Sequence, residues 1–295
     1  MTAGERWRTG VRRARRRWPI LDHTLRAEVR YSEVLGGRLA AAIAYYGFFA
    51  CFALALLAYS LLGFLLEYDR EVFAAVESFL RQNLPWLEPS AIAGTRGRSG
   101  VLGLVGLMLT GIGWIEAIRS SQRLIHGVTQ QPGHPVLRWL TDLLILVALL
   151  LLIGSSLTVI YALEWAIEAV VGGPSTLLSV VGWVFAVGLN LVLALALVGG
   201  VPRLRLSRWR LWPSAIFVAV GITALNTLGQ LVVGYVRSNP AYTVVTGAVG
   251  LLLYLYLFNQ LLLFGAALAA TARSGRVHDL AGGDPEHVTP PSAGR

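Results

Sequence analysis

The sequence contains no lysine and only one cysteine. All 25 of its basic residues are arginine, so the chain has no Walker A phosphate loop, no lysine for a Schiff base and no Ser-Lys nucleophile pair. Cys51 has no second cysteine with which to pair, and this excludes an intramolecular disulfide framework. These absences remove P-loop proteins and two classes of covalent catalyst from consideration.

Motifs for metal binding and catalysis are absent as well. The histidines form no HxxxH or HxH pair and lie outside the long apolar runs, so no zinc or iron site is expected. They are His23, His126, His134, His278 and His287. The chain also lacks a GxGxxG before a helix and a GxSxG elbow. We therefore expect no cofactor and no enzyme activity, while an intramembrane enzyme built from scattered residues stays open as an alternative.

Charge is scarce, and long apolar runs take its place. The chain is 14% charged and 55% hydrophobic, far from the composition of an average soluble domain. At a rise of about 1.5 Å per residue, its runs are long enough to cross a hydrocarbon core of about 30 Å. A backbone in lipid must satisfy its own hydrogen bonds, so each run is predicted to be a helix. The sequence thus predicts an all-α, polytopic membrane protein with six transmembrane helices at about residues 40–66, 101–118, 137–163, 176–200, 211–236 and 244–270.

The regions outside these helices divide the chain into three parts. Residues 1–38 form an Arg-rich arm and a short interfacial helix, expected to lie on anionic lipid headgroups rather than to bind nucleic acid. Residues 39–272 form the transmembrane domain, and residues 273–295 a tail predicted to be disordered. The first outer loop, residues 67–100, is expected to contain an amphipathic helix with Val72, Phe73, Val76, Phe79 and Leu80 on its apolar side.

The arginines predict an orientation in the membrane. The N-terminal arm, the link after the second helix, the loop at 203–210 and the tail fall on one side and are strongly basic. Because cytoplasmic loops carry an excess of Lys and Arg, both termini are predicted to be cytoplasmic in a multi-pass plasma-membrane protein.

The fifth helix carries a polar stripe. Steps of three, four, seven, eleven and fourteen residues keep its members on one helical face: they are Thr223, Asn226, Thr227, Gln230, Gly234 and Arg237. Asn190 in the fourth helix, and Asn259 and Gln260 in the sixth, are candidate partners. Two interpretations stay open: hydrogen bonds that join neighbouring helices, or the wall of a polar groove open toward the outer side.

An ionisable cluster ends the second helix. Glu116, Arg119 and Arg123 lie three and four residues apart and therefore share one face. Such a cluster is either an internal ion pair or part of a polar pathway, and we favour the ion pair.

Several motifs resemble the YihY/BrkB family of bacterial inner-membrane proteins. The run A-Y-Y-G-F-F at 44–49 is similar to the family's AYY signature, and the runs at 242–247, 254–256 and 262–266 are similar to its closing hairpin. The similarity covers about residues 25–275. The chain departs from the family pattern where Gly-Ala-Glu is common, because Gly265-Ala266-Ala267 stands there.

The resemblance implies a six-helix inner-membrane protein of a family regarded as candidate transporters without a settled substrate. An older family label, ribonuclease BN, implies a metal-dependent nuclease, but such an enzyme needs a His/Asp cluster that this sequence lacks. We therefore predict a transporter or exporter of an amphipathic or lipid-like substrate through a polar-lined groove. The alternative is a non-transporting scaffold that recruits partners through its Arg-rich cytoplasmic face; the sequence assigns no oligomeric state.

Overall fold

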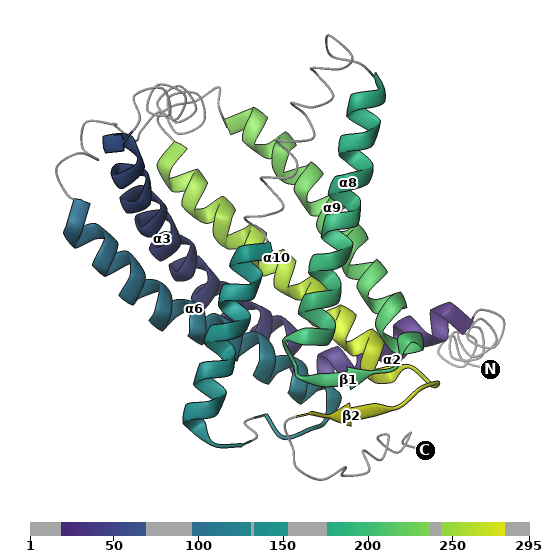
Figure 1. The fold of residues 1–295 in the computed structure, drawn as a ribbon. Helices are drawn as coiled ribbons and strands as arrows, with labels where there is room; N and C mark the ends of the chain where they lie inside the picture. Colours follow the sequence, from purple (N-terminus) through teal and green to yellow (C-terminus); the bar gives the residue numbers. More distant parts are fainter. Residues whose placement is uncertain (1–18, 69–95, 131–132, 153–175, 237–242, 281–295) are drawn as a thin grey trace. The chain divides into compact units, whose positions relative to one another are not determined.

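The computed structural model describes residues 19–68, 96–130, 133–152, 176–236 and 243–280. Six helices in this part of the chain are long and apolar enough to cross a membrane, which confirms the prediction of an all-α, polytopic membrane protein. The helices, drawn in Figure 1, are α2 (Pro19–Glu33), α3 (Gly36–Tyr68), α6 (Arg96–His126), an unlabelled helix at Pro135–Leu152, α8 (Thr176–Leu195), α9 (Arg208–Val236) and α10 (Thr243–Thr271).

Two helices differ from the predicted ranges in informative ways. α6 continues to His126, well beyond the predicted end at residue 118. The sequence suggested an end there because charges follow, but the buried arginines of this last part find partners inside the protein, so the helix continues. α8 ends in a five-residue π-helix, η1 (Ala196–Gly200), within the predicted fourth span. The expected arm at 1–18 and the amphipathic helix at 72–80 lie outside the described residues.

The chain forms two compact units, and the smaller one spans Tyr45–Trp114. In it, α3 and α6 pack through glycines, because a Cβ at Gly103 would come within 2.7 Å of the backbone nitrogen of Leu57. Such close backbone approach is typical of small residues between membrane helices. Aromatic side chains on α3 make edge-to-face ring contacts, with centroids of Tyr45 and Phe49 4.9 Å apart.

The larger unit comprises residues 1–44 and 115–295, and α9 lies at its centre between α8 and α10. α9 and α10 form the predicted antiparallel hairpin (Figure 1). They touch closely at Gly265, where a Cβ would lie 2.3 Å from Cγ2 of Val218. α2 packs against α10, where His23 Nε2 lies 2.8 Å from the carbonyl oxygen of Leu268. α10 therefore packs against both α9 and α2.

A short antiparallel strand pair closes one end of the larger unit. β1 (Leu204–Leu206) precedes α9, and β2 (Val277–Asp279) follows α10, with Leu204 opposite Asp279. Residues 277–279 are thus a strand where the sequence predicts disorder, because β1 supplies hydrogen-bonding partners that no local pattern reveals. We call this end of the unit, with the last turns of α6 and the first turn of α9, the basic end.

Candidate functional site

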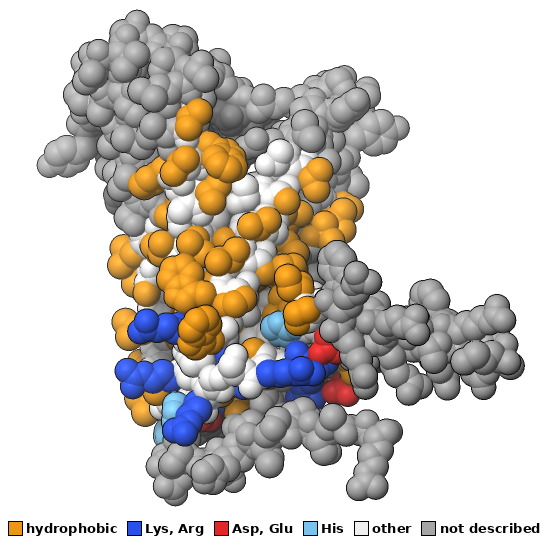
Figure 2. Space-filling view, turned by 90° about the vertical axis from the view of Figure 1, so that its right-hand side faces the viewer, with side chains coloured by type: hydrophobic (Ala, Val, Ile, Leu, Met, Phe, Trp, Pro, Cys, Tyr) orange, Lys and Arg blue, Asp and Glu red, His pale blue; other side chains and the backbone are white. Residues whose placement is uncertain are grey.

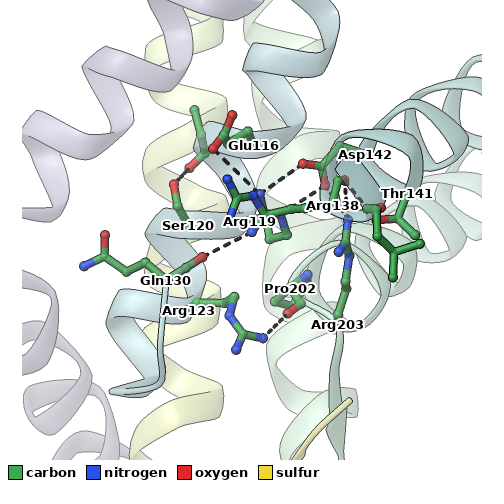
Figure 3. A network of polar contacts seen from close by, with 12 residues as sticks. Glu116, Arg119, Ser120, Arg123, Gln130, Arg138, Thr141, Asp142, Pro202 and Arg203 are labelled. Atoms are coloured by element: carbon green, nitrogen blue, oxygen red, sulfur yellow. Dashed lines mark hydrogen bonds and ion pairs between the residues drawn. The ribbon is translucent and has the colours of Figure 1, made fainter. Parts of the chain in front are cut away.

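A buried arginine–aspartate network occupies the basic end. Arg119 and Asp142 are 0% and 1% exposed, and Nε and Nη2 of Arg119 donate to the two oxygens of Asp142 at 3.0 Å each (Figure 3). Arg203 Nη2 donates to Oδ1 of the same carboxylate at 2.6 Å. Planar, bidentate pairs of this kind are among the strongest charge-assisted hydrogen bonds. Asp142 therefore joins the end of α6 to the loop that leads into β1.

Arg123 extends the network to the C-terminal strand. It is fully buried, and its Nη1 donates to Asp279 Oδ1 at 2.9 Å and to the carbonyl oxygen of Pro202 at 3.1 Å. Its Nη2 pairs with the other oxygen of Asp279, and its Nε donates to the carbonyl oxygen of Thr129. We define Arg119, Arg123, Asp142, Arg203 and Asp279 as the arginine network.

The surroundings of the network offset the cost of burying these charges. Arg119 Nη1 donates to the carbonyl oxygen of Gln130 at 3.1 Å, so each buried guanidinium combines a carboxylate with a carbonyl, as buried charge requires. Burial lowers the pKa of Arg203 from its usual value; the adjacent Asp142 opposes this, while Arg119 adds to it. Asp142 lies between Arg119 and Arg203, and Asp279 pairs with Arg123, so two aspartates offset part of the charge of three arginines.

The π-helix η1 supplies another acceptor beside the network. In a π-helix each carbonyl accepts from the amide five residues later, as the carbonyl oxygen of Ala196 does from the amide of Val201. The carbonyl of Leu197 cannot be bonded in this way, because the residue five positions later is Pro202, which has no N–H. The carbonyl of Leu197 instead accepts from Gln122 Nε2 at 3.1 Å. The π turn therefore ties α6 to the end of α8.

The structure rearranges the ionisable cluster that the sequence singled out. Glu116 lies 3.9 Å from Arg119 and is 38% exposed on its side chain, whereas the closer carboxylate of Arg119 is Asp142, 3.0 Å away. Arg123 pairs with Asp279. Sequence reasoning missed both aspartates as partners; Asp142 carried a signal, since an acid at the start of an apolar helix calls for a partner, but Asp279 carried none.

The described part of the polar stripe on α9 bonds to two neighbouring helices. Asn190 on α8 donates to Thr223 Oγ1 at 3.0 Å, and the hydroxyl of Tyr254 on α10 donates to Asn226 Oδ1 at 2.6 Å. Thr227 is exposed and donates back to the carbonyl oxygen of Thr223 within α9. Thr223 and Asn226 therefore take part in interhelical bonding, whereas the hydroxyl of Thr227 is bonded within its own helix.

The remaining stripe candidates are not brought together. Asn259 is buried and donates to Leu255 within its own helix, α10, at 2.8 Å, so it does not bond to the stripe. Gln260 lines a groove on another face of α9. The side chain of Gln230 and the whole of Arg237 lie outside the described residues.

An open groove lies on the face of α9 that is roughly opposite to the polar stripe, since successive helical residues are about 100° apart around the axis. It has a volume of about 430 Å³, and three helices line it: Glu28 and Tyr31 from α2; Phe217, Gly221, Ala224, Leu225 and Leu228 from α9; Leu257, Gln260, Leu261 and Phe264 from α10. We call it the lateral groove. Gly221 forms part of its floor, where a Cβ would lie 2.9 Å from Cδ2 of Leu261.

The lateral groove has a polar end and an apolar end. Tyr31 of α2 contacts Phe264, with ring centroids 6.0 Å apart, and Phe264 contacts Phe217 at 5.5 Å. Glu28 lies on α2 one turn before Tyr31, so it belongs to this end, while Leu228 and Leu257 line the other. The only signal for the groove in the sequence is weak, namely the small residues Gly221 and Ala224 on one face of the fifth helix.

Charge on the surface is concentrated at the basic end. Figure 2 shows the basic side chains of the face it draws toward one end, where acidic and His side chains also lie. Arg205 and Arg208 are exposed there beside Trp209, which is 74% exposed. Within the described ranges, no group of three or more His, Cys, Asp or Glu residues could hold a metal ion.

Comparison with known proteins agrees with this architecture. Residues 29–287 match the family described as virulence factor BrkB. The chain is 26% identical to an uncharacterized protein of Dickeya dadantii (strain 3937), over 86% of this chain and 84% of that protein. It is 23% identical to the inner membrane protein YhjD of Escherichia coli (strain K12), over 87% of this chain and 82% of YhjD. No solved structure matches the chain. The resemblance seen in the sequence is confirmed: this multi-pass membrane protein belongs to the BrkB/YihY family.

Proposed function

We propose that this protein binds an amphipathic, lipid-like molecule in the lateral groove and moves it across the plasma (inner) membrane. The length of the groove carries the proposal. From Phe217 to Leu228 it follows α9 for about 11 residues, or about 16 Å at about 1.5 Å per residue. This is about half of a hydrocarbon core of about 30 Å, the depth that one leaflet's acyl chain occupies.

The lining of the groove supports the same substrate class. Leu228 and Leu257 line one end and Glu28 and Tyr31 the other, with the amide of Gln260 between Leu257 and Phe264 along α10. The only carboxylate among the described lining residues thus lies at one end, as a site for a molecule with a headgroup and a tail requires. Apolar walls with a few polar groups at a defined position are typical of small-molecule sites.

The arginines support a cytoplasmic location for the polar end and for both termini. α2 is attached to the C-terminal end of α10, where Arg273 pairs with Asp22 at 3.1 Å. The exposed Arg205 lies nearby in β1, and the exposed Arg208 is the first residue of α9. Since basic residues favour the cytoplasmic side, the groove would open to the inner leaflet with its polar end at headgroup level.

This proposal uses the lateral groove in place of the polar stripe. Thr223 and Asn226 already bond to α8 and α10, so they favour helix association over a solvated track in the described part of α9. The substrate class predicted from the sequence is retained, and the surface proposed to hold it changes.

The test is lipid movement in proteoliposomes that contain a fluorescent short-chain phospholipid, read by chemical quenching of the outer leaflet. The exposed Ala224 is a groove residue, so Ala224→Trp should fill the groove and reduce the protein-dependent rate at least several-fold. Val220→Trp is the matched control, because Val220 is 62% exposed on the same helix but does not line the groove. Equal rates for the two variants, or no acceleration by the unaltered protein, would count against the proposal.

A membrane scaffold is the second candidate, and the exposed arginines of the basic end favour it. Arg205 lies in β1, and Arg208 and Trp209 lie in the first turn of α9; all three are exposed. They follow Arg203, which is bonded to Asp142 of the buried network. They could recruit an anionic partner or anionic lipid headgroups. Proteoliposomes that show no lipid movement, together with loss of anionic-vesicle binding in Arg205→Gln/Arg208→Gln, would favour the scaffold.

A further inference from the structure

We infer that the lateral groove selects amphiphiles with an ammonium headgroup, and that the Glu28 carboxylate binds this ammonium. The inference rests on the proposed function and names its substrate class. The chain has a net charge of +9 and 25 arginines, yet none of the described residues that line the groove is an arginine. The one charged residue among them is an acid, Glu28.

Glu28 is available to a ligand at the polar end. It is exposed on α2. The hydroxyl of Ser32, a neutral donor one turn later, donates to Oε1 of Glu28 at 3.1 Å. The arginines of α2 have other acceptors: Arg30 donates to the carbonyl oxygens of Leu124 and Ile125, and Arg26 pairs with Asp22 at 3.2 Å. An incoming cation would therefore meet a carboxylate that these arginines do not neutralise.

Tyr31 shows that additional negative charge is unfavourable at this end of the groove. Burial raises the pKa of its phenol to about 12, with Tyr256 and the nearby Glu28 as further causes. The phenol therefore stays neutral at ordinary pH. An anionic headgroup placed here would be repelled by the same carboxylate, whereas an ammonium is attracted to it.

The expected selectivity is modest, because Glu28 is exposed. Exposed ion pairs contribute about 0.2–1 kcal/mol, which corresponds to a preference of up to about fivefold. A phospholipid with an ammonium headgroup, such as phosphatidylethanolamine, combines this charge with an acyl chain long enough to follow the groove. Phosphatidylglycerol has the same chains without the ammonium and is the natural comparison.

The experiment measures which lipid the purified full-length protein retains from an equimolar mixture of these two lipids with identical acyl chains, by native mass spectrometry. The lipid bound in the groove is the difference between the amount of lipid that the unaltered protein retains and the amount that Ala224→Trp retains. In this groove-bound lipid we expect phosphatidylethanolamine to exceed phosphatidylglycerol by about two- to fivefold, and Glu28→Gln to bring the ratio close to one. Glu33→Gln is the control, since Glu33 is an exposed acid of the same helix that does not line the groove.

An unchanged ratio in Glu28→Gln, or groove-bound lipid in which phosphatidylglycerol exceeds phosphatidylethanolamine, would overturn the inference. If Glu28→Gln does not fold, the unaltered protein is offered N-acetylated phosphatidylethanolamine, whose nitrogen carries no charge. Retention equal to that of the parent lipid would then overturn it. Failure of the proposed function looks different: selective retention would persist while the proteoliposome assay shows no lipid movement.

Discussion

At the scale of single residues, the arginine network shows how a membrane helix can carry charge deep inside a protein. Arg119 and Arg123 are both fully buried, and each pairs with a carboxylate far along the chain. Removing one partner of a buried pair leaves the other charge without compensation, which costs far more than losing an exposed pair. Asp142, which two arginines share, is therefore the residue whose loss should matter most.

Asp142→Asn should destabilise the protein by about 3–5 kcal/mol, because Arg119 and Arg203 then lose their common carboxylate. The measurement is the free energy of unfolding of the purified protein in a denaturing detergent. Glu116→Gln is the control: this acid is 3.9 Å from Arg119 and partly exposed, so its loss should cost at most about 1 kcal/mol. Similar losses for both variants would mean that the network does not have the stabilising role inferred from its geometry.

At the scale of helices, α9 uses two faces for two purposes. One face carries Thr223 and Asn226, which bond to α8 and α10, and the other faces the lateral groove with Gly221 and Ala224. Polar bonds between membrane helices average about 0.6 kcal/mol and reach about 2 kcal/mol. They are sufficient to fix which side of α9 meets its neighbours, and this leaves the small residues on the other side free to form a hollow.

A double-mutant cycle of Asn226→Ala and Tyr254→Phe should give a coupling energy of about 0.6–2 kcal/mol, because each substitution removes one partner of the 2.6 Å bond. The readout is again the free energy of unfolding. The companion cycle of Thr227→Ala and Tyr254→Phe should give a coupling near zero, since Thr227 bonds within α9. Coupling of equal size in both cycles would contradict an interhelical role specific to Asn226.

At the scale of the whole molecule, the basic end of the larger unit depends on segments from both halves of the sequence. β1 precedes α9 and β2 follows α10, and the two strands pair. Asp279 of β2 forms an ion pair with Arg123 of α6. Arg210 adds hydrogen bonds to the carbonyl oxygens of Ala269 and Ala270 at the end of α10. The residues just after the last membrane helix therefore contribute to the packing of the transmembrane domain.

A chain that ends at residue 276 should lose about 3 kcal/mol or more of unfolding free energy, because it lacks β2 and leaves the buried Arg123 without Asp279. A chain that ends at residue 280 keeps both and should match the full-length protein. Thermal unfolding of the two truncations in the same detergent makes the comparison. Equal stability of both shortened chains would show that the strand pair adds nothing to the fold.

The sequence by itself determined the number and approximate position of the membrane helices, the antiparallel hairpin of α9 and α10, and the family. These follow from local quantities: the length of each apolar run, the need for a backbone in lipid to bond internally, and the short link at residues 237–243. The concentration of arginine in particular loops could be seen in the same way. None of these features depends on which helices meet.

Tertiary structure alone decided the partners of Arg119 and Arg123, the strand pair at 277–279 and the lateral groove. Periodicity shows which residues share a face of one helix, but in lipid an apolar residue can face either the bilayer or another helix, so the pattern does not show which face is buried. Asp279 is 156 residues from Arg123, and the groove needs side chains from three helices. Such contacts exist only once the helices have packed.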